Sequence, residues 1–325
     1  MKRLYLLIFL LFSPILHAED ILLSFPVDCD YGKNCFIQNY VDLEASKNHQ
    51  DYKCNRLSYN AHKGTDVRLL DYVQMEQGVK VLAAEDGIVK AIRNDQDDFK
   101  YLEKGAIAVL KKACGNGIVI DVSNGYELQY CHMKKDSIKV LEGQKIRKGD
   151  FIGLIGMSGK TEFPHLHLAL RKNGKIIDPF TGLSPTENYN CNNPTQNNYF
   201  WDRELEYIET AILHFNITDK VPNKESARKG RFRNDSLKSN LKQIILWADI
   251  MGIQKGDKIL FEMFDSKNKT KIFSNSQIMK KPYVQYFIYS GKKINNLKKG
   301  NYNAKIKIFR KDKMILQQTK KIEVI

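Results

Sequence analysis

The sequence predicts a mainly β protein built from two antiparallel β domains. From Gly78 onward the chain consists of short apolar runs separated by glycine-containing turns, such as "VKVLAAEDGIVKAIR" and "IKVLEGQKIRKGDFIGLIGMSG". Runs of this length with Asp-Gly and Lys-Gly turns are typical of antiparallel sheet. A second series of alternating runs follows the Asn-, Pro- and Thr-rich stretch "SPTENYNCNNPTQNNYFW". That change in composition indicates a linker, which we place at residues 191–204.

Residues 1–18 have the pattern of a secretory signal peptide. Two basic residues precede an apolar run over residues 4–12, and Ala18 stands at a plausible cleavage point. The apolar run is shorter than the roughly 20 residues of a membrane span, and no later segment is long and apolar enough to cross a bilayer. No cysteine follows the cleavage point to carry a lipid anchor. We therefore expect a soluble exported protein, either periplasmic or secreted, with no membrane span.

Six cysteines lie in the mature chain, and residues 19–56 form an irregular N-terminal segment that carries three of them. An even number of cysteines in an exported chain favours disulfides, and a metal site is disfavoured because no C-x2-C pair is present. Cys114–Cys131 is the preferred pairing, since both residues flank a hairpin whose Asn124-Gly125 is a two-residue turn signal. Cys29–Cys35 would close a small loop, and Cys54–Cys191 follows only by elimination.

Residues 205–325 contain six or seven alternating strand-like runs, which predicts a β-sandwich of immunoglobulin-like type. The formal net charge of the chain is +15, or +13 without the signal peptide, and much of the excess lies in lysines of this region. Such a charge suits a cell-wall polymer, a lipid surface, an acidic peptide or nucleic acid. Dispersed lysines on strands are also typical of a solvated face. We expect no nucleic-acid partner, because the chain is exported and carries no nucleic-acid motif.

Two histidines, His165 and His167, stand two residues apart in the apolar run "HLHLALRKNGKIIDPF". Positions i and i+2 of a strand point to the same face, so both imidazoles are expected on one face. Upstream, "NAHKGTDVRL" places His62 four residues before Asp66. Helical spacing would bring those two side chains together, but Gly64 lies between them and strand-like residues follow, which favours a tight turn at Gly64.

His62, Asp66 and His167 together offer two nitrogens and one oxygen, the three protein ligands typical of catalytic zinc. Zinc with a free fourth position makes hydroxide available near neutral pH. His132, in "YCHMKK", and His165 would supply a proton acceptor and oxyanion stabilisation. Four of the seven histidines thus gather in three short motifs, whereas His49 and His214 have no partner pattern.

These motifs carry a family resemblance. The order His-x3-Asp, a strand-ending Tyr-x-His, and Pro-His-Leu-His followed by Asp-Pro is similar to that of the M23 metallopeptidases, the lysostaphin or LytM-type zinc endopeptidases that cut peptide bridges in peptidoglycan. The resemblance spans about residues 57–183, and we place an M23-like zinc peptidase domain at residues 57–190. It implies an antiparallel LytM-like fold and one zinc ion per chain, held by His62, Asp66 and His167. It also implies catalytic roles for His132 and His165.

Some features depart from the family pattern. Leu168-Ala169 follow His167 where the family has a bulkier or acidic residue, and residues 94–113 insert an exposed excursion between strands. None of these departures removes a ligand. Family members that lack ligands serve as non-catalytic activators of other wall hydrolases, so the intact ligand set argues against that role here. Asp178, before a proline, is expected to be a turn residue outside the site.

The resemblance implies a zinc endopeptidase acting on the stem peptides of peptidoglycan. Two other functions stay open: a non-catalytic wall-binding activator, and a zinc endopeptidase acting on proteins. The C-terminal domain would contact the wall or a protein partner, or would cover the cleft.

Overall fold

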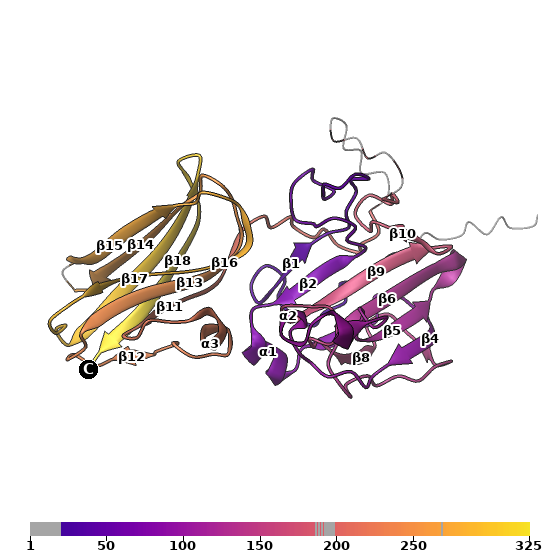
Figure 1. Ribbon diagram of the computed structural model, residues 1–325, viewed down its shortest axis with the longest axis horizontal. Coiled ribbons are helices and arrows are strands. Elements are labelled where there is room, and N and C mark those ends of the chain that lie inside the picture. The colour runs from indigo at the N-terminus through magenta and orange to yellow at the C-terminus, as the bar shows by residue number, and fades with distance from the viewer. Residues whose placement is uncertain (1–20, 186, 188, 190, 192–198, 268) are drawn as a thin grey trace, which may run out of the picture.

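The computed structural model describes residues 21–325 except 186, 188, 190, 192–198 and 268. The predicted signal peptide and half of the predicted linker, residues 192–198, therefore lie outside the described residues. Two β domains stand side by side (Figure 1), so the mainly β, antiparallel fold class is confirmed. Among the described residues, no helix has the length and apolar character needed to cross a membrane.

The N-terminal domain is built on one large antiparallel sheet with the order β1-β2-β9-β6-β5-β4-β7, and β10 pairs with β9 outside this path. A separate pair, β3 and β8, packs beside it. Its strands are β1 (Cys35–Asn39), β2 (Thr65–Leu69), β3 (Lys80–Leu82), β4 (Gly87–Arg93), β5 (Asn116–Asp121), β6 (Tyr126–Met133), β7 (Lys145–Ile146), β8 (Phe151–Leu154), β9 (His165–Lys172) and β10 (Lys175–Ile177). Short helices α1 (Tyr72–Gln77), α2 (Tyr101–Lys104), η1 (Ala106–Val109) and η2 (Ser123–Gly125) connect them.

The central strands bury one face in the domain core. Leu166 and Leu168 of β9 are buried together with Leu128 of β6, as expected where apolar residues alternate along a strand. The histidines of β9 consequently point to the opposite face of the sheet. That face carries the candidate site, so the strand alternation predicted from the sequence is confirmed here.

All three disulfides have the pairing expected from the sequence: Cys29–Cys35, Cys54–Cys191 and Cys114–Cys131. The hairpin between Cys114 and Cys131 is present, but its loop differs from the expectation. Strand pairing ends with the hydrogen bond from Val122 N to Tyr126 O, so Ser123–Gly125 form a three-residue loop in place of a two-residue turn. Residues 94–113 form the expected excursion and contain α2 and η1.

The N-terminal segment was expected to be irregular, and this expectation is wrong for part of it. Residues Cys35–Asn39 form β1, which pairs with β2 at the edge of the large sheet. The segment also contributes Leu23 and Tyr40, both fully buried, to the core of this domain. The segment is thus part of the first domain, because its apolar residues complete the core.

The C-terminal domain is a sandwich of two sheets, with the orders β11-β13-β16 and β12-β18-β17-β14-β15. Its elements are β11 (Ala211–Thr218), α3 (Lys224–Arg228), β12 (Ser236–Leu237), β13 (Gln243–Ile253), β14 (Lys258–Asp265), β15 (Lys271–Ile278), β16 (Tyr283–Lys293), β17 (Gly300–Arg310) and β18 (Lys313–Val324). A second apolar core, including Ile250, Phe261 and Ile306, fills the space between the sheets. The immunoglobulin-like assignment of this sandwich stays a prediction.

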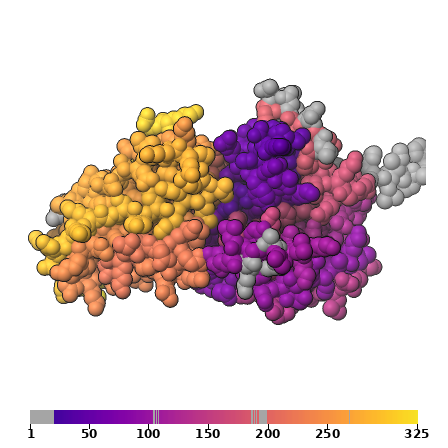
Figure 2. Space-filling model, viewed as in Figure 1, coloured from indigo at the N-terminus to yellow at the C-terminus, as the bar shows by residue number. Residues whose placement is uncertain are grey.

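The two domains are in contact (Figure 2). The contact contains an apolar cluster and, next to it, charged side chains. Phe36 of β1 packs with Leu213 of β11 and Met251 of β13. Next to it, Asp71, the N-cap of α1, accepts a hydrogen bond from Arg233 and lies 2.9 Å from Nε2 of His214. His214, which has no partner pattern in the sequence, therefore belongs to the domain interface.

Candidate metal centre and active site

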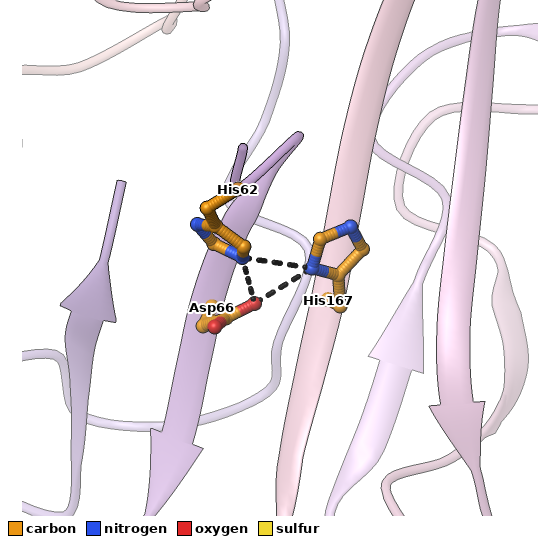
Figure 3. Close-up of side chains that lie close together, drawn as sticks. All are labelled: His62, Asp66 and His167. Carbon is orange, nitrogen blue, oxygen red and sulfur yellow. Dashed lines mark hydrogen bonds and ion pairs between the residues drawn. The ribbon is translucent and has the colours of Figure 1, made fainter. Parts of the chain in front are cut away.

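The candidate metal centre lies where β2 meets β9. Asp66 on β2 is the register partner of His167 on β9, while His62 lies in the turn that leads into β2. The three side chains point toward one another (Figure 3). His62 Nε2 is 3.1 Å from Asp66 Oδ1 and 3.2 Å from His167 Nδ1, and His167 Nδ1 is 2.8 Å from Asp66 Oδ1. Three donor atoms from two strands and a turn thus converge on one point.

The donor set and its spacing fit a zinc ion. Zinc bonds to histidine nitrogen and carboxylate oxygen are about 2.0–2.2 Å long, so tetrahedral ligand atoms lie roughly 3.3 Å apart. The observed separations of 2.8, 3.1 and 3.2 Å are close to that value. Calcium and magnesium prefer ligand sets made of oxygen alone, so two imidazoles favour zinc. Among the described residues, this is the one group of His, Cys, Asp or Glu whose ligand atoms gather closely enough to hold a metal.

Residues of β1 and of the segment after it hold two of the three ligands in place. The ring nitrogen Nδ1 of His62 donates to the carbonyl oxygen of Tyr40 at 2.7 Å, which leaves Nε2 free to face the metal position. The side-chain amide of Asn39 donates to Asp66 Oδ2 at 2.9 Å, and Asp66 Oδ1 faces His62 and His167. Partners of this kind fix the tautomer and orientation of metal ligands.

Gly64 has a different role from the one expected. Its backbone does not need the left-handed conformation, so it is not required for the turn between His62 and Asp66. A Cβ at this position would instead lie 2.6 Å from the carbonyl oxygen of Leu168 and 2.7 Å from Nε2 of His167. A Cβ atom essentially never lies this close to another heavy atom, so any other residue would displace the backbone of Leu168 or the imidazole of His167.

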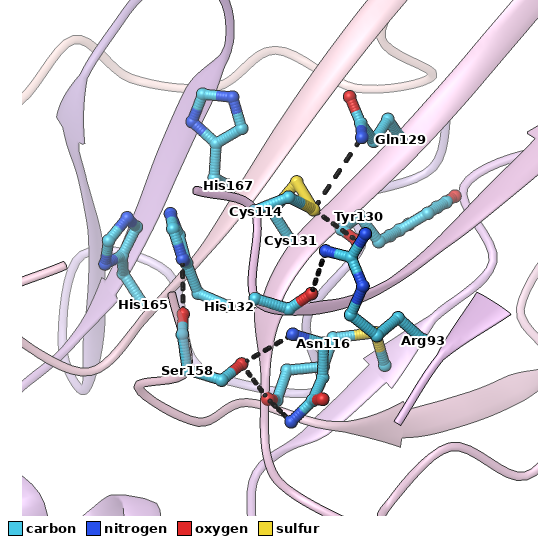
Figure 4. Close-up of a disulfide and its surroundings, with 12 residues drawn as sticks. Arg93, Cys114, Asn116, Gln129, Tyr130, Cys131, His132, Ser158, His165 and His167 are labelled. Atoms are coloured by element: carbon cyan, nitrogen blue, oxygen red, sulfur yellow. Dashed lines mark hydrogen bonds between the residues drawn. A yellow bond between two sulfur atoms is a disulfide. The ribbon is translucent and has the colours of Figure 1, made fainter. Parts of the chain in front are cut away.

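His165 and His132 lie beside the metal triad on the same face. His165 Nε2 is 3.6 Å from Asp66 Oδ1, and the ring centroids of His132 and His165 are 4.7 Å apart. Nδ1 of His165 donates to the carbonyl oxygen of Phe163 at 2.9 Å, and Nδ1 of His132 donates to that of Ser158 at 2.8 Å (Figure 4). With Nδ1 used in this way, both rings have their Nε2 lone pair free.

The backbone of β6 is distorted where it carries His132. This residue has φ of 64°, in the left-handed region that non-glycine residues seldom occupy. The register between β5 and β6 shifts at the same place, so the strand contains a β-bulge. The Cys114–Cys131 disulfide adjoins the bulge (Figure 4). Bulges next to active sites re-aim side chains, and here the bulge directs His132 toward the site.

Burial and neighbouring groups set the charges of the site. Burial would raise the pKa of Asp66, but the imidazoles of His62, His165 and His167 hold it well below its usual value, so the carboxyl is ionised. Burial, assisted by the other imidazoles, lowers the pKa of His132 well below its ordinary value. Burial also lowers the pKa of His165. Both rings are therefore neutral near pH 7 and able to accept a proton.

All five residues expected at the site are brought together: His62, Asp66, His132, His165 and His167. Sequence reasoning missed Asn39 and the carbonyl of Tyr40, and the short run "CFIQN", with Phe and Ile but no alternation, is only a weak sign of a strand. Asp178 lies outside the site, fully buried after β10, where its carboxylate accepts from the hydroxyl of Thr181 at 2.8 Å.

Three converging donors beside two neutral imidazoles form the kind of centre that metallopeptidases use. The family model that matches the chain is that of Peptidase family M23, over residues 60–179. The matched residues contain the candidate metal triad and both further histidines, so the similarity to peptidase family M23 includes the whole candidate site.

Two curated relatives are similar to the same part of the chain. The peptidoglycan DD-endopeptidase ShyA of Vibrio cholerae is 32% identical over 124 residues, which cover 38% of this chain and 23% of ShyA. The DD-carboxypeptidase/endopeptidase Mpg of Neisseria meningitidis is 32% identical over 117 residues, which cover 36% of this chain and 23% of Mpg. The chain thus spans less than a quarter of the length of either relative.

A solved structure with a similar fold is the catalytic domain of the prophage-encoded M23 protein EnpA from Enterococcus faecalis. It is 22% identical, covers 43% of this chain and 88% of its own length, and has a TM-score of 0.29.

Proposed function

We propose that this chain is an exported zinc-dependent endopeptidase that hydrolyses the peptide cross-links of peptidoglycan. The observation that carries the proposal is the convergence of His62, Asp66 and His167 at 2.8–3.2 Å, with two neutral imidazoles on the same face. We place the peptidase domain at residues 57–190, completed by β1, and the accessory domain at residues 205–325. The proposed compartment is the periplasm or the exterior of the cell, because the proposed substrate is the wall.

His62, Asp66 and His167 would hold the zinc ion, which when bound polarises a peptide carbonyl and makes water a stronger nucleophile near neutral pH. The ionised carboxyl of Asp66 supplies the negative charge of the ligand set. His132 and His165 each present a free Nε2 to this face of the sheet. One of them accepts the proton of the attacking water at Nε2, and the imidazolium so formed stabilises the developing oxyanion and then gives this proton to the leaving amine. The ring of the other lies beside it, with the two centroids 4.7 Å apart.

A groove of about 390 Å³ has His62, Lys63, Ile176 and Pro185 among its lining residues. We propose that part of the peptide substrate lies in this groove. The two relatives described above are named for DD-endopeptidase or DD-carboxypeptidase activity. We therefore propose the D-alanyl cross-link as the bond cleaved, and a glycine-rich bridge if the host lacks an outer membrane.

The test combines zinc content with release of soluble muropeptides from purified sacculi. The wild-type chain is expected to bind one zinc ion and to release fragments. His167→Ala is expected to lose both zinc and fragment release, since it removes one of three ligands. His49→Ala is the matched control, because His49 lies outside the site and its substitution should change neither readout.

Two results would overturn the proposal. One bound zinc ion with no release from any sacculus would indicate a non-catalytic activator of other wall hydrolases. Cleavage of proteins with intact sacculi left untouched would indicate a protein endopeptidase.

A further inference from the structure

The excess of positive charge in this protein lies in one domain. Residues 205–325 contain 26 Lys and Arg but only 11 Asp and Glu, a formal charge of +15, whereas residues 1–204 contain 26 of each and are formally neutral. The basic character therefore belongs to the C-terminal sandwich alone. A charge of this size on an accessory domain is a physical reason to look for an anionic partner.

Lysines gather at one end of the sandwich, which we call the loop end. Three connections meet there: residues 254–257 between β13 and β14, residues 279–282 between β15 and β16, and the β17–β18 hairpin at residues 311–312. The hairpin projects from the upper side of the C-terminal domain in Figures 1 and 2. The lysines of the loop end are Lys255, Lys258, Lys280, Lys281, Lys311 and Lys313, and all six are exposed.

These lysines are not neutralised within the chain. None of the six forms an ion pair with a carboxylate of the residues that the structure describes. Of the acidic residues at this end, Asp257 is 1% exposed and is bound by Arg310, which also binds Glu209. Asp312 is the exposed acidic residue of the hairpin. The loop end thus presents six positive charges against one exposed negative charge.

Large apolar side chains are exposed at the same place. The strand register aligns Ile278 of β15 with Lys258 of β14, Lys258 with Phe309 of β17, and Phe309 with Met314 of β18. Register partners share one face of a sheet, so these four residues form a row along the outer rim. Ile278 is 64% exposed and Met314 is 48% exposed. Apolar residues therefore lie among the lysines.

We propose that the loop end binds the surface of an anionic lipid bilayer. Lysines beside exposed apolar side chains are the combination that peripheral membrane binding requires, because the lysines attract phosphate-bearing headgroups and the apolar side chains enter the interface. A soluble polyanion such as a wall polymer would use the lysines but would gain nothing from Ile278 and Met314. The outer face of the other sheet is not free for this role, since it carries α3 and the contact with the peptidase domain.

The test uses the full chain with sedimenting vesicles of phosphatidylcholine that contain roughly 30 mol% phosphatidylglycerol. Binding is expected to these vesicles and not to pure phosphatidylcholine, and to weaken as salt rises, because screening shortens the range of the attraction. Each lysine near an anionic surface contributes about fivefold to partitioning, so K280Q with K281Q should lower the partition coefficient roughly 30-fold.

The apolar row supplies the second arm of the experiment. I278S with M314S leaves the charge unchanged and should lower vesicle binding roughly tenfold or more. The matched control is K292Q with K293Q, which removes the same charge at the opposite end of β16 and should change binding less than about twofold. Melting temperatures of all variants establish that they are folded.

Three results would overturn the proposal: equal binding to neutral and anionic vesicles, equal loss in the control pair, or no loss on I278S with M314S. Binding to sacculi or soluble polyanions without binding to vesicles would assign the lysines to a wall polymer instead. Muropeptide release by the same variants is measured separately, so failure of membrane binding and failure of the proposed hydrolase activity are distinguishable.

Discussion

Replacing Asn39 by alanine tests whether β1, which lies outside the part of the chain that matches the family model, belongs to the metal centre. The Asn39 amide donates to Asp66 Oδ2 at 2.9 Å, and the two residues are 4% and 2% exposed. A buried hydrogen bond to a charged group contributes about 1.5–3 kcal/mol. If that energy is lost from the zinc-loaded state, zinc affinity falls about 10–100-fold, the range found for such partners of metal ligands.

The assay is competition for zinc against a chromophoric chelator, with the absorption spectrum of the cobalt-substituted protein as a second readout of ligand geometry. The carbonyl of Tyr40 still accepts from His62 in Asn39→Ala, so the change acts on Asp66 alone. Asn295→Ala, an exposed site in the C-terminal domain, is the control. A folded Asn39→Ala protein with zinc affinity within about twofold of wild type would refute the reasoning.

Three further substitutions separate metal binding, packing and proton linkage. His132→Ala should keep one zinc ion per chain while muropeptide release falls about 10²–10⁴-fold; near-normal release would remove His132 from catalysis. Gly64→Ala should weaken zinc binding by displacing His167, measured by the same chelator competition, and unchanged affinity would contradict the close approach. Burial raises the pKa of Asp178 to about 7 from 3.8. The stability it contributes is therefore fully present below pH 3.8 and is lost as pH rises through 7. Asp178→Asn should thus become more stable relative to wild type as pH increases from about 5 to 8, by about 2.5 kcal/mol and with a matching rise in relative melting temperature, and parallel curves for the two proteins would contradict this linkage.

The candidate ligands could be picked out because each pair is local in the sequence: His165 and His167 share a face through strand alternation, and His62 and Asp66 are separated by only one turn. Their convergence depends on the pairing of β2 with β9, which the family resemblance implied and local spacing does not give. The contacts of Asn39 were not predictable in the same way, since they depend on a pairing between β1 and β2 across the Cys54-containing segment. Strand pairing of this kind is decided by burial of the whole sheet, and the short run "CFIQN" does not reveal its partner.

The contacts at the domain interface could not be predicted from the sequence either. The strands of the C-terminal sandwich follow from their alternating pattern, but α3 and its docking do not, because a five-residue helix has little periodicity. His214 has no neighbour in sequence that would mark it, and it acquires Asp71 only when β11 is placed beside α1. Ion pairs between domains are therefore found from the structure and not from the sequence.

The position of Asp71 connects the two domains to the metal centre. Asp66 lies on β2 and Asp71 follows the end of that strand, where burial opposes its charge but His214 and Arg233 still lower its pKa to about 2. The carboxylate is thus ionised near neutral pH, and its two partners come from the C-terminal domain. The strand that carries Asp66, a candidate metal ligand, is thereby joined to that domain by the ion pair of Asp71 with Arg233 and by the apolar contact of Phe36. If the loop end rests on a bilayer, these contacts relate the orientation of the face that carries His132, His165 and His167 to that of the membrane. The C-terminal domain would then determine which layer of the wall the active site reaches.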